Sequence, residues 1–405
     1  MGAALRGRSR GLPSRLTDEA QACSRKTAVI ECLLSLQDRP GLTRRDPVKF
    51  GLFYQLPCAD SQSEVTRYQE TIEQIIHADT LGFDCAWLAE LHFFKPFSIM
   101  PSPLIMATAA AQRTKKIRLG IAVNLLPLYH PLRSAEDGAT VDILSDGRLE
   151  FGVGRGAIPL HFSGFNVSRE ESRERFEESI EIIQKAWTTE SFSYTGKYYQ
   201  IPETSVVPKP VQKPHPPIRI AANSPDTAVF AGKARSPVLV ASVTNPLPRM
   251  FEQVATYRQA WAAGKALSSS QASAGPNVST MFFFYPGESA AQVRRDIEPS
   301  LNNYFHSVSQ MVRAGAKPQG EDESYRYLQD VQRHIENLTF DKITQTMAIF
   351  GSSQECIAKV KELHTELQMN ELICWFNPGG LVPHEKVLAA MSRFAAEVLP
   401  ELRPL

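Results

Sequence analysis

The sequence lacks the cysteine and histidine patterns of a disulfide framework or a metal site. No two of its six cysteines form a C-x-x-C pair, and its nine histidines show neither H-x-H nor H-E-x-x-H spacing. Sparse, unpaired cysteines are typical of intracellular proteins whose thiols stay reduced. We therefore expect core thiols, as at Cys85 and Cys374, which lie inside apolar runs, and no protein-bound metal.

The sequence also lacks an excess of charge of one sign and any long apolar run. Its 44 basic and 43 acidic residues give a net charge of +1. This balance argues against nucleic acid or an anionic membrane surface as the partner. No run of 18 apolar residues is present, and the first residues lack the apolar core of a secretory signal. We expect a cytoplasmic protein without membrane association.

Residues 1–46 differ in composition from the rest of the chain. They hold nine Lys or Arg against five Asp or Glu, and the first acid is Asp18. An arginine-rich, acid-poor start is compatible with a transit peptide, and also with a disordered extension or a start codon placed too far upstream. We predict a disordered N-terminal extension over 1–46 and one folded domain over 47–405.

From Pro47 onward, short apolar stretches alternate with helical patterns. The expected strands are 48–54, 83–89, 117–123, 149–153, 218–222, 237–242, 278–285 and 371–376. Such alternation predicts parallel strands, and eight strand–helix units favour a (β/α)₈ TIM barrel with insertions over a doubly wound open sheet. The segment 191–217, rich in proline and tyrosine, predicts a hairpin and a surface crossing. Helix-capping boxes are expected at Ser61–Glu64, Ser168–Glu171 and Ser352–Glu355.

In a barrel, functional residues lie at the C-terminal ends of the strands. The fourth expected strand runs into Gly152-Val153-Gly154-Arg155-Gly156. Glycines let a backbone approach a ligand closely, and a guanidinium suits phosphate. A tight turn with a surface arginine is the alternative. A dinucleotide-binding fingerprint does not fit, because Ile158-Pro159 follows where a helix should run.

The fifth expected strand ends at Ala222 and is followed by Asn223-Ser224-Pro225-Asp226-Thr227. Ser224 suits an N-cap and Pro225 the first helical position, so ordinary capping explains the motif. A helix that starts here also directs free N–H groups and a positive dipole end outward. Because strands four and five are neighbours in a barrel, Arg155 would face this helix start and complete a monophosphate cradle.

The second expected strand ends in Glu90-Leu91-His92-Phe93. A histidine beyond a strand end can act as acid or base near neutral pH, or can be a loop histidine bonded to backbone. His130 opens the helix that follows the third expected strand, and it suits a structural role before the turn.

Several motifs recur in one order along the chain. They are KFGLF at 49–53, E-x-H-F at 90–93, LLPLYHPLR at 125–133, the block from Asp142 to Gly156, PKPVQKPHPPI at 208–218, AANSPDT at 221–227, GSSQECI at 351–357 and the closing FNPGGLVPHEKVLAAMSRFAAEVLPEL. With them, the chain from Val48 to Leu402 resembles the bacterial luciferase-like flavin-dependent monooxygenases, the family of the alkanal monooxygenases.

The resemblance implies an FMN-binding (β/α)₈ barrel, commonly a homodimer. Such a protein takes reduced FMN from a separate NAD(P)H:flavin reductase and uses O₂ to oxygenate a small organic substrate. By position, Gly154, Arg155 and Gly156 would bind the FMN phosphate. Three residues after the fifth expected strand would complete this phosphate site: Asn223, Ser224 and Thr227. Ala122 and Val123 lie where the family often has a non-proline cis peptide against the flavin ring.

The chain departs from the luciferases at two positions. Leu91 replaces the first histidine of their Glu-His-His-Phe motif, and Gly154 occupies the position of their reactive cysteine. These changes argue against light emission and leave His92 as the candidate catalytic residue. A deazaflavin-dependent oxidoreductase of the same superfamily and a non-catalytic flavin-binding subunit are the alternative functions. The sequence carries no motif for the substrate.

Overall fold

The computed structural model describes residues 47–264, 275–315 and 338–405. The predicted disordered extension, 1–46, lies outside these residues, so that interpretation stays a prediction. Among the described residues, no helix is both long enough and apolar enough to cross a membrane.

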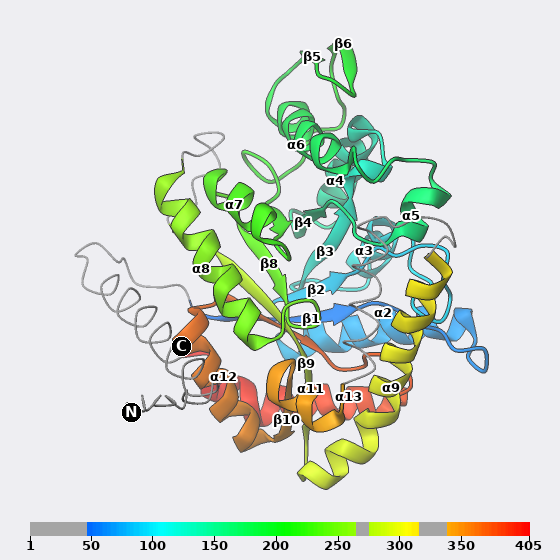
Figure 1. Cartoon of the computed structure of the whole chain (residues 1–405), viewed down its shortest axis with the longest axis vertical. Helices are drawn as coiled ribbons and strands as arrows, with labels where there is room; N and C mark the ends of the chain where they lie inside the picture. Colours follow the sequence, from blue (N-terminus) through cyan, green and yellow to red (C-terminus); the bar gives the residue numbers. More distant parts are fainter. Residues whose placement is uncertain (1–46, 265–274, 316–337) are drawn as a thin grey trace, which may run out of the picture. The chain divides into compact units, whose positions relative to one another are not determined.

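Eight parallel strands close a barrel, as the sequence predicted (Figure 1). In order around the barrel they are β1 (Lys49–Tyr54), β2 (Cys85–Leu88), β3 (Arg118–Leu125), β4 (Leu149–Gly154), β7 (Ile218–Ala221), β8 (Val238–Ala241), β9 (Val278–Gly287) and β11 (Glu371–Trp375). Pairing of β8 with β9 and of β11 with β1 closes the ring. All eight overlap the stretches expected from the sequence.

Helices follow the strands and cover the outside of the barrel (Figure 1). They are α2 (Glu64–Leu81), α3 (Pro103–Ala111), α4 (Pro131–Leu144), α6 (Ser172–Thr188), α7 (Pro225–Lys233), α8 (Leu247–Ala263), α9 (Ala290–Gly315), α12 (Ser353–Leu367) and α13 (His384–Arg393). The chain ends in a π-helical turn, η2 (Phe394–Val398), and α14 (Leu399–Leu402). Their inward faces bury the apolar side chains that the periodic patterns marked, such as Phe176 and Val387.

Insertions add shorter elements to the barrel. The predicted hairpin is present as β5 (Phe192–Thr195) paired antiparallel with β6 (Gln200–Thr204). The strand β10 (Ala348–Ser352) was not predicted; it extends the sheet by pairing with the second half of β9. The remaining elements are the 3₁₀ turn η1 (Leu126–Leu128), α5 (Pro159–Gly164) and α11 (Phe340–Thr346).

One of the three expected capping boxes is confirmed, that of Ser352 with Glu355 at the start of α12. At α2 the cap is Ser63, not Ser61, and its hydroxyl accepts the Thr66 amide. Ser168 does not cap α6 either, because its hydroxyl donates to the Glu170 carboxylate and the helix begins four residues later.

A buried ionic network fills the barrel near its N-terminal end. The Arg219 Nε donates to Glu150 over 2.9 Å, and Trp87 Nε1 donates to Glu371 over 2.8 Å. Burial raises the pKa of Glu371, a shift that Arg219 opposes. For Glu150, burial acts in the same direction, but Arg219 and Arg118 outweigh it and lower the pKa. Because these side chains fill the N-terminal end of the barrel, we expect a ligand to bind at the C-terminal rim.

The two halves of that rim differ in side-chain size. Phe53, Phe283 and Trp375, from β1, β9 and β11, form an aromatic half, in which the Phe53 and Trp375 rings lie 4.8 Å apart. Phe283 and Trp375 are fully buried beneath Tyr304 of α9.

The opposite half of the rim carries small side chains. Strand register puts Ala221 and Ala241 on the inner face, and a Cβ on Gly154 would lie 3.7 Å from the Ala221 Cβ. Ala221 and Ala241 are only half-buried, although they face the inside of a barrel. The rim is therefore open on the side of β3, β4, β7 and β8.

Candidate functional site

Glu90 and His92 form a buried pair beyond the end of β2, exposed by 3% and 6%. The Glu90 Oε1 lies 3.1 Å from His92 Nε2. The other carboxylate oxygen, Oε2, accepts the Asn124 side-chain amide at 2.8 Å and the Leu125 backbone amide at 3.3 Å. Glu90 is thus fixed to the end of β3 and in turn orients the His92 ring. His92 is the residue that the sequence analysis names as the catalytic candidate.

The peptide bond between Ala122 and Val123 is cis, as the resemblance implied. It coincides with a register shift between β3 and β4, and both residues are half-buried at the open half of the rim. A Cβ on Gly154 would come 2.5 Å from the Val123 side chain, so glycine is the residue that fits this position. Next to it, the buried Asn124 Oδ1 has no hydrogen-bond partner among the described residues.

Arg155 and the start of α7 lie close together, as expected for neighbouring strands. Half-buried Arg155 forms no hydrogen bond or ion pair with any residue that the structure describes. Burial and the charge of Arg173 lower its pKa, against the opposing effect of Asp226 at the start of α7. An unpaired guanidinium beside a helix N-terminus suits an anionic group.

Ser224 caps α7, and its hydroxyl accepts the Thr227 amide at 3.4 Å. The Ser224 and Thr227 hydroxyls lie 2.9 Å apart. The Asn223 side-chain oxygen accepts the Ala241 amide and the Asn245 side-chain amide, and the expected contact of Asn223 with the phosphate stays a prediction. Its oxygen therefore fixes the end of β8.

Two further arginines, Arg169 and Arg173, lie near Arg155. Arg173 reaches Asp226 at 3.5 Å and Glu177 at 3.2 Å. The sequence analysis missed both, because they precede or begin α6 and approach the rim only through the packing of that helix. The i,i+4 pair of Arg173 with Glu177 is that of an ordinary surface helix.

His161 of α5 holds the loop that carries His92. Its Nε2 accepts the His92 backbone amide at 3.1 Å, and the side chain is buried. Burial and the nearby His92 lower the pKa of His161 to about 4, against the opposing effect of that hydrogen bond. His161 is therefore neutral at physiological pH. His130, by contrast, caps α4 through its Nδ1.

This lowered pKa predicts a loss of stability in acid. The unfolded chain protonates His161 below about pH 6.5 and the folded protein only below about pH 4, so stability should fall across that window by about 1 kcal/mol per pH unit. Urea unfolding at two pH values, compared with His161→Gln, measures this. The glutamine keeps an acceptor for the His92 amide and should flatten the dependence; equal slopes in both proteins would contradict the prediction.

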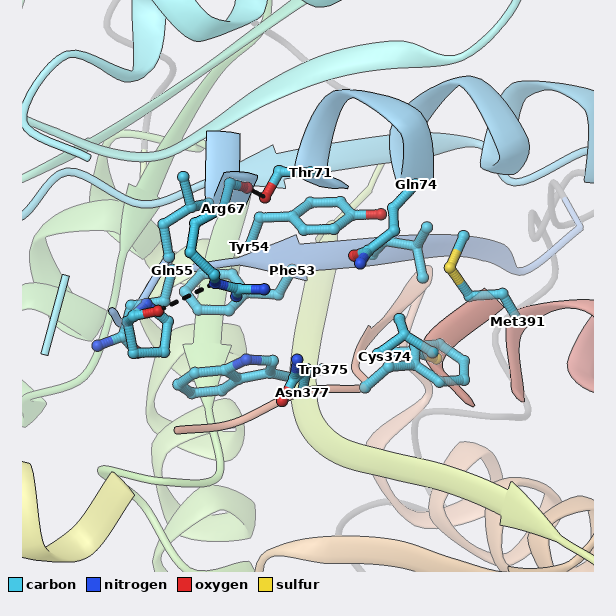
Figure 2. A pocket seen from close by; sticks show the side chains of 15 residues that line it. Phe53, Tyr54, Gln55, Arg67, Thr71, Gln74, Cys374, Trp375, Asn377 and Met391 are labelled. Carbon is cyan, nitrogen blue, oxygen red and sulfur yellow. Dashed lines mark hydrogen bonds between the residues drawn. The ribbon is translucent and has the colours of Figure 1, made fainter. Parts of the chain in front are cut away.

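A small cavity lies beside the rim, between β1, β11 and α2 (Figure 2). In Figure 2, Arg67, Tyr54 and Gln74 reach into the space above Trp375. Its volume is about 20 Å³, enough for a single water and far too small for a ring system. None of the predicted site residues lines it, so it is not the site expected from the sequence.

The hydroxyl of Tyr54 is buried there without a partner among the described residues, and burial raises its pKa. We expect Tyr54→Phe to leave the free energy of unfolding unchanged or to raise it by up to about 2 kcal/mol, because an unsatisfied hydroxyl is removed. Tyr257→Phe is the matched control: its buried hydroxyl bonds Ser236 and Asn277, so about 1 kcal/mol should be lost. A comparable loss in Tyr54→Phe would show that water satisfies its hydroxyl.

The fold and the rim define an α/β-barrel protein whose site is built at the C-terminal ends of its strands. The chain belongs to the luciferase-like monooxygenase family, whose model matches residues 48–368.

Two relatives illustrate the family. Over 367 residues the chain is 25% identical to the alkanal monooxygenase alpha chain of the Kryptophanaron alfredi symbiont, covering 88% of this chain and 99% of the relative. Over 187 residues it is 33% identical to the oxygenase component of a flavin-dependent trigonelline monooxygenase from Acinetobacter baylyi. The match covers 45% of this chain and 51% of the relative. That match spans about half of the relative's length.

Solved structures agree with the fold. The oxygenating constituent of 3,6-diketocamphane monooxygenase from Pseudomonas putida, in complex with FMN, matches with a TM-score of 0.70 at 18% identity, covering 88% of this chain and 99% of the other. An F420-dependent secondary alcohol dehydrogenase matches with a TM-score of 0.67 at 17% identity, covering 88% of this chain and 99% of the other. Proteins with this fold therefore include one solved in complex with FMN and one named as F420-dependent.

Proposed function

We propose that the protein is the oxygenase component of a two-component monooxygenase. It would receive reduced FMN from a separate NAD(P)H:flavin reductase and use O₂ to add one oxygen atom to a small organic substrate. The family and the relative named as an oxygenase component support this proposal. The observation that carries it is the open, small-residue half of the rim, which ends at the unpaired Arg155.

The residues present fit a flavin. Ala122, Val123 and Gly154 give a flat ring system an apolar support, and the unpartnered Asn124 oxygen offers a hydrogen-bond acceptor beside them. Arg155 would hold the phosphate.

Further donors for the phosphate come from the start of α7, with the Asp226 backbone amide and the hydroxyls of Ser224 and Thr227. Asn223 would contribute its side-chain amide group, since its oxygen is already bonded to β8. Bound reduced flavin would supply the electrons that activate O₂.

His92 would control the proton at the reacting centre. Its Nε2 is held by Glu90, so Nδ1 is the nitrogen left to exchange a proton. No described residue bonds that nitrogen, and the aromatic rings of Phe93 and Phe165 pack against the imidazole. Leu91 cannot take this role, since it has no titratable group.

A deazaflavin-dependent hydride transfer is the second candidate. The observation that favours it is the group of three arginines near the start of α7, more positive charge than one monophosphate requires. A flavin-binding subunit without catalysis is the third, based on Leu91.

One experiment separates the three. The protein is mixed anaerobically with reduced FMN, O₂ is admitted, and absorbance is followed. Delayed flavin oxidation with incorporation of labelled oxygen into a substrate supports the first candidate. Tight F420 binding without any oxygen reaction supports the second, and FMN binding that leaves the oxidation rate unchanged supports the third. The homodimer and the cytoplasmic location stay predictions.

A further inference from the structure

We propose that the substrate carries a flat, neutral aromatic ring that stacks on Phe53 at the aromatic half of the rim, and that the Tyr304 hydroxyl donates a hydrogen bond to an acceptor atom on or beside that ring. This substrate class rests on the function proposed above. It adds Tyr304 of α9 as a specificity-determining residue that lies outside the strand-end motifs.

Phe53, Trp375 and Phe283 face the interior of the barrel as one layer. Side chains alternate along a strand, so Trp375 shares a face of β11 with Glu371, whose carboxylate belongs to the buried ionic network. Register places Phe283 beside Trp375 and Phe53 at the same level of β1. The three rings therefore lie above the network, at the C-terminal end of the interior.

Small side chains stand across the interior from this layer. They are Gly154, Ala221 and Ala241, on β4, β7 and β8. Because such side chains leave the space between the two halves unfilled, a ligand over the small-residue half has its other side toward the rings. With the flavin at the small-residue half as proposed, the substrate would lie between the flavin and the aromatic layer.

Phe53 is the ring of this layer that is left for a ligand to contact. Phe283 and Trp375 are fully buried, whereas Phe53 is half-buried. The Trp375 ring packs edge-on against Phe53 at 4.8 Å and lies 5.2 Å from Phe283, so Phe53 is held in place. A flat ring gains more from stacking on a fixed aromatic side chain than a saturated ring of the same size does.

Tyr304 brings an unpaired hydroxyl to this apolar half. Its ring lies 5.1 Å from Trp375, 5.6 Å from Phe283 and 5.7 Å from Phe97. The residue is 6% exposed, and its hydroxyl forms no hydrogen bond with any residue that the structure describes. Burial raises the pKa of Tyr304, so the phenol keeps its proton and is a donor. Because an unpaired hydroxyl in such surroundings is costly, an acceptor on the substrate would be favourable.

The charge beside this half is already paired within the protein. Among the described residues around the small cavity that Phe53 and Trp375 also line, only Arg67 is charged (Figure 2). Its guanidinium pairs with Glu70 at 2.9 Å, and its Nε donates to the Pro57 carbonyl at 3.2 Å. A neutral ring therefore suits this half better than a charged one.

The test measures how three small probes bind to the flavin-free, full-length protein in equilibrium dialysis. Acetophenone has an aromatic ring and an acceptor, ethylbenzene has the ring alone, and cyclohexyl methyl ketone has the acceptor alone. Phe53→Leu should weaken acetophenone and ethylbenzene about five-fold and leave the saturated ketone within about two-fold. Tyr304→Phe should weaken the two ketones about five-fold and leave ethylbenzene within about two-fold.

Two variants away from the aromatic half serve as controls. Phe350→Leu removes a half-buried ring of β10 that stacks on Phe340 at 5.8 Å. Tyr285→Phe removes a hydroxyl of β9 that donates to Asp296 at 3.4 Å. Both should leave the affinities of all three probes within about two-fold of native.

The proposal is overturned if none of the probes binds the native protein, or if either site variant weakens all three equally. It is also overturned if Phe53→Leu weakens reduced FMN and not the aromatic probes, because the rings would then serve the flavin. The expected pattern of losses in a protein that oxygenates no substrate would leave this binding site standing and refute the proposed function instead.

Discussion

His92→Ala is expected to cut product formation about 100-fold while reduced FMN still binds within a few-fold of the native affinity. The imidazole is held by Glu90 at 3.1 Å, and His161, the other histidine at the rim, is kept neutral by a pKa of about 4. This leaves His92 as the histidine proposed to control the proton at the reacting centre. Without it, H₂O₂ release should rise as product falls. Single-turnover yields of product and H₂O₂ per flavin oxidised measure both.

His130→Asn is the matched control, because it removes a nearby histidine and keeps a residue that can cap α4. Its product yield should stay near native. If His92→Ala retained full coupling of flavin oxidation to product, His92 would be a structural loop histidine. The proton donor would then have to be sought at another group of the rim.

Arg155→Ala is expected to weaken binding of reduced FMN about 30-fold or more, the loss of a charge-assisted contact worth about 2–4 kcal/mol. The guanidinium has no partner among the described residues and lies near the start of α7, where an anion would be bound. Riboflavin lacks the phosphate and should bind the variant and the native protein almost equally. Anaerobic titration with the two reduced flavins measures the difference.

Arg294→Ala controls for the change in net charge, since this exposed arginine pairs with Glu298 on α9. It should leave both affinities unchanged. Equal losses of FMN and riboflavin in Arg155→Ala would show that the guanidinium does not hold the phosphate and would remove it from the proposed cradle.

The barrel could be predicted because its strands are buried on both sides and most of them appear as apolar runs, although Glu150 interrupts β4 and Arg219 interrupts β7. Strand β10 escaped because its apolar run, from Met347 to Phe350, is short and is followed at once by Gly351 and the Ser352 cap. The cap of α2 was assigned to Ser61 on its S-x-x-E spacing. In the structure Ser61 belongs to a turn closed by Gln62 and Ala59, and the helix starts at Glu64.

The candidate site could be predicted where its residues directly follow strands, as His92, Arg155 and Ser224 do. Residues that reach the rim from elsewhere left no comparable signal. His161 comes from a short helix after a loop and contacts His92 across 69 positions of sequence, and the bond of the Asn223 oxygen to β8 joins residues 18 positions apart. Local spacing does not encode such long-range packing.

The division of the rim also bears on how such a barrel can evolve. The small-residue half, on β3, β4, β7 and β8, and the aromatic half, on β1, β9 and β11, are carried by different strands. Mutations at Phe53, Phe283 or Trp375 can therefore reshape one half without touching Gly154 or Ala221 on the other. With reduced flavin bound at the small-residue half as proposed, selection for a new substrate would act on the aromatic set of strands, while the cofactor would constrain the small-residue set.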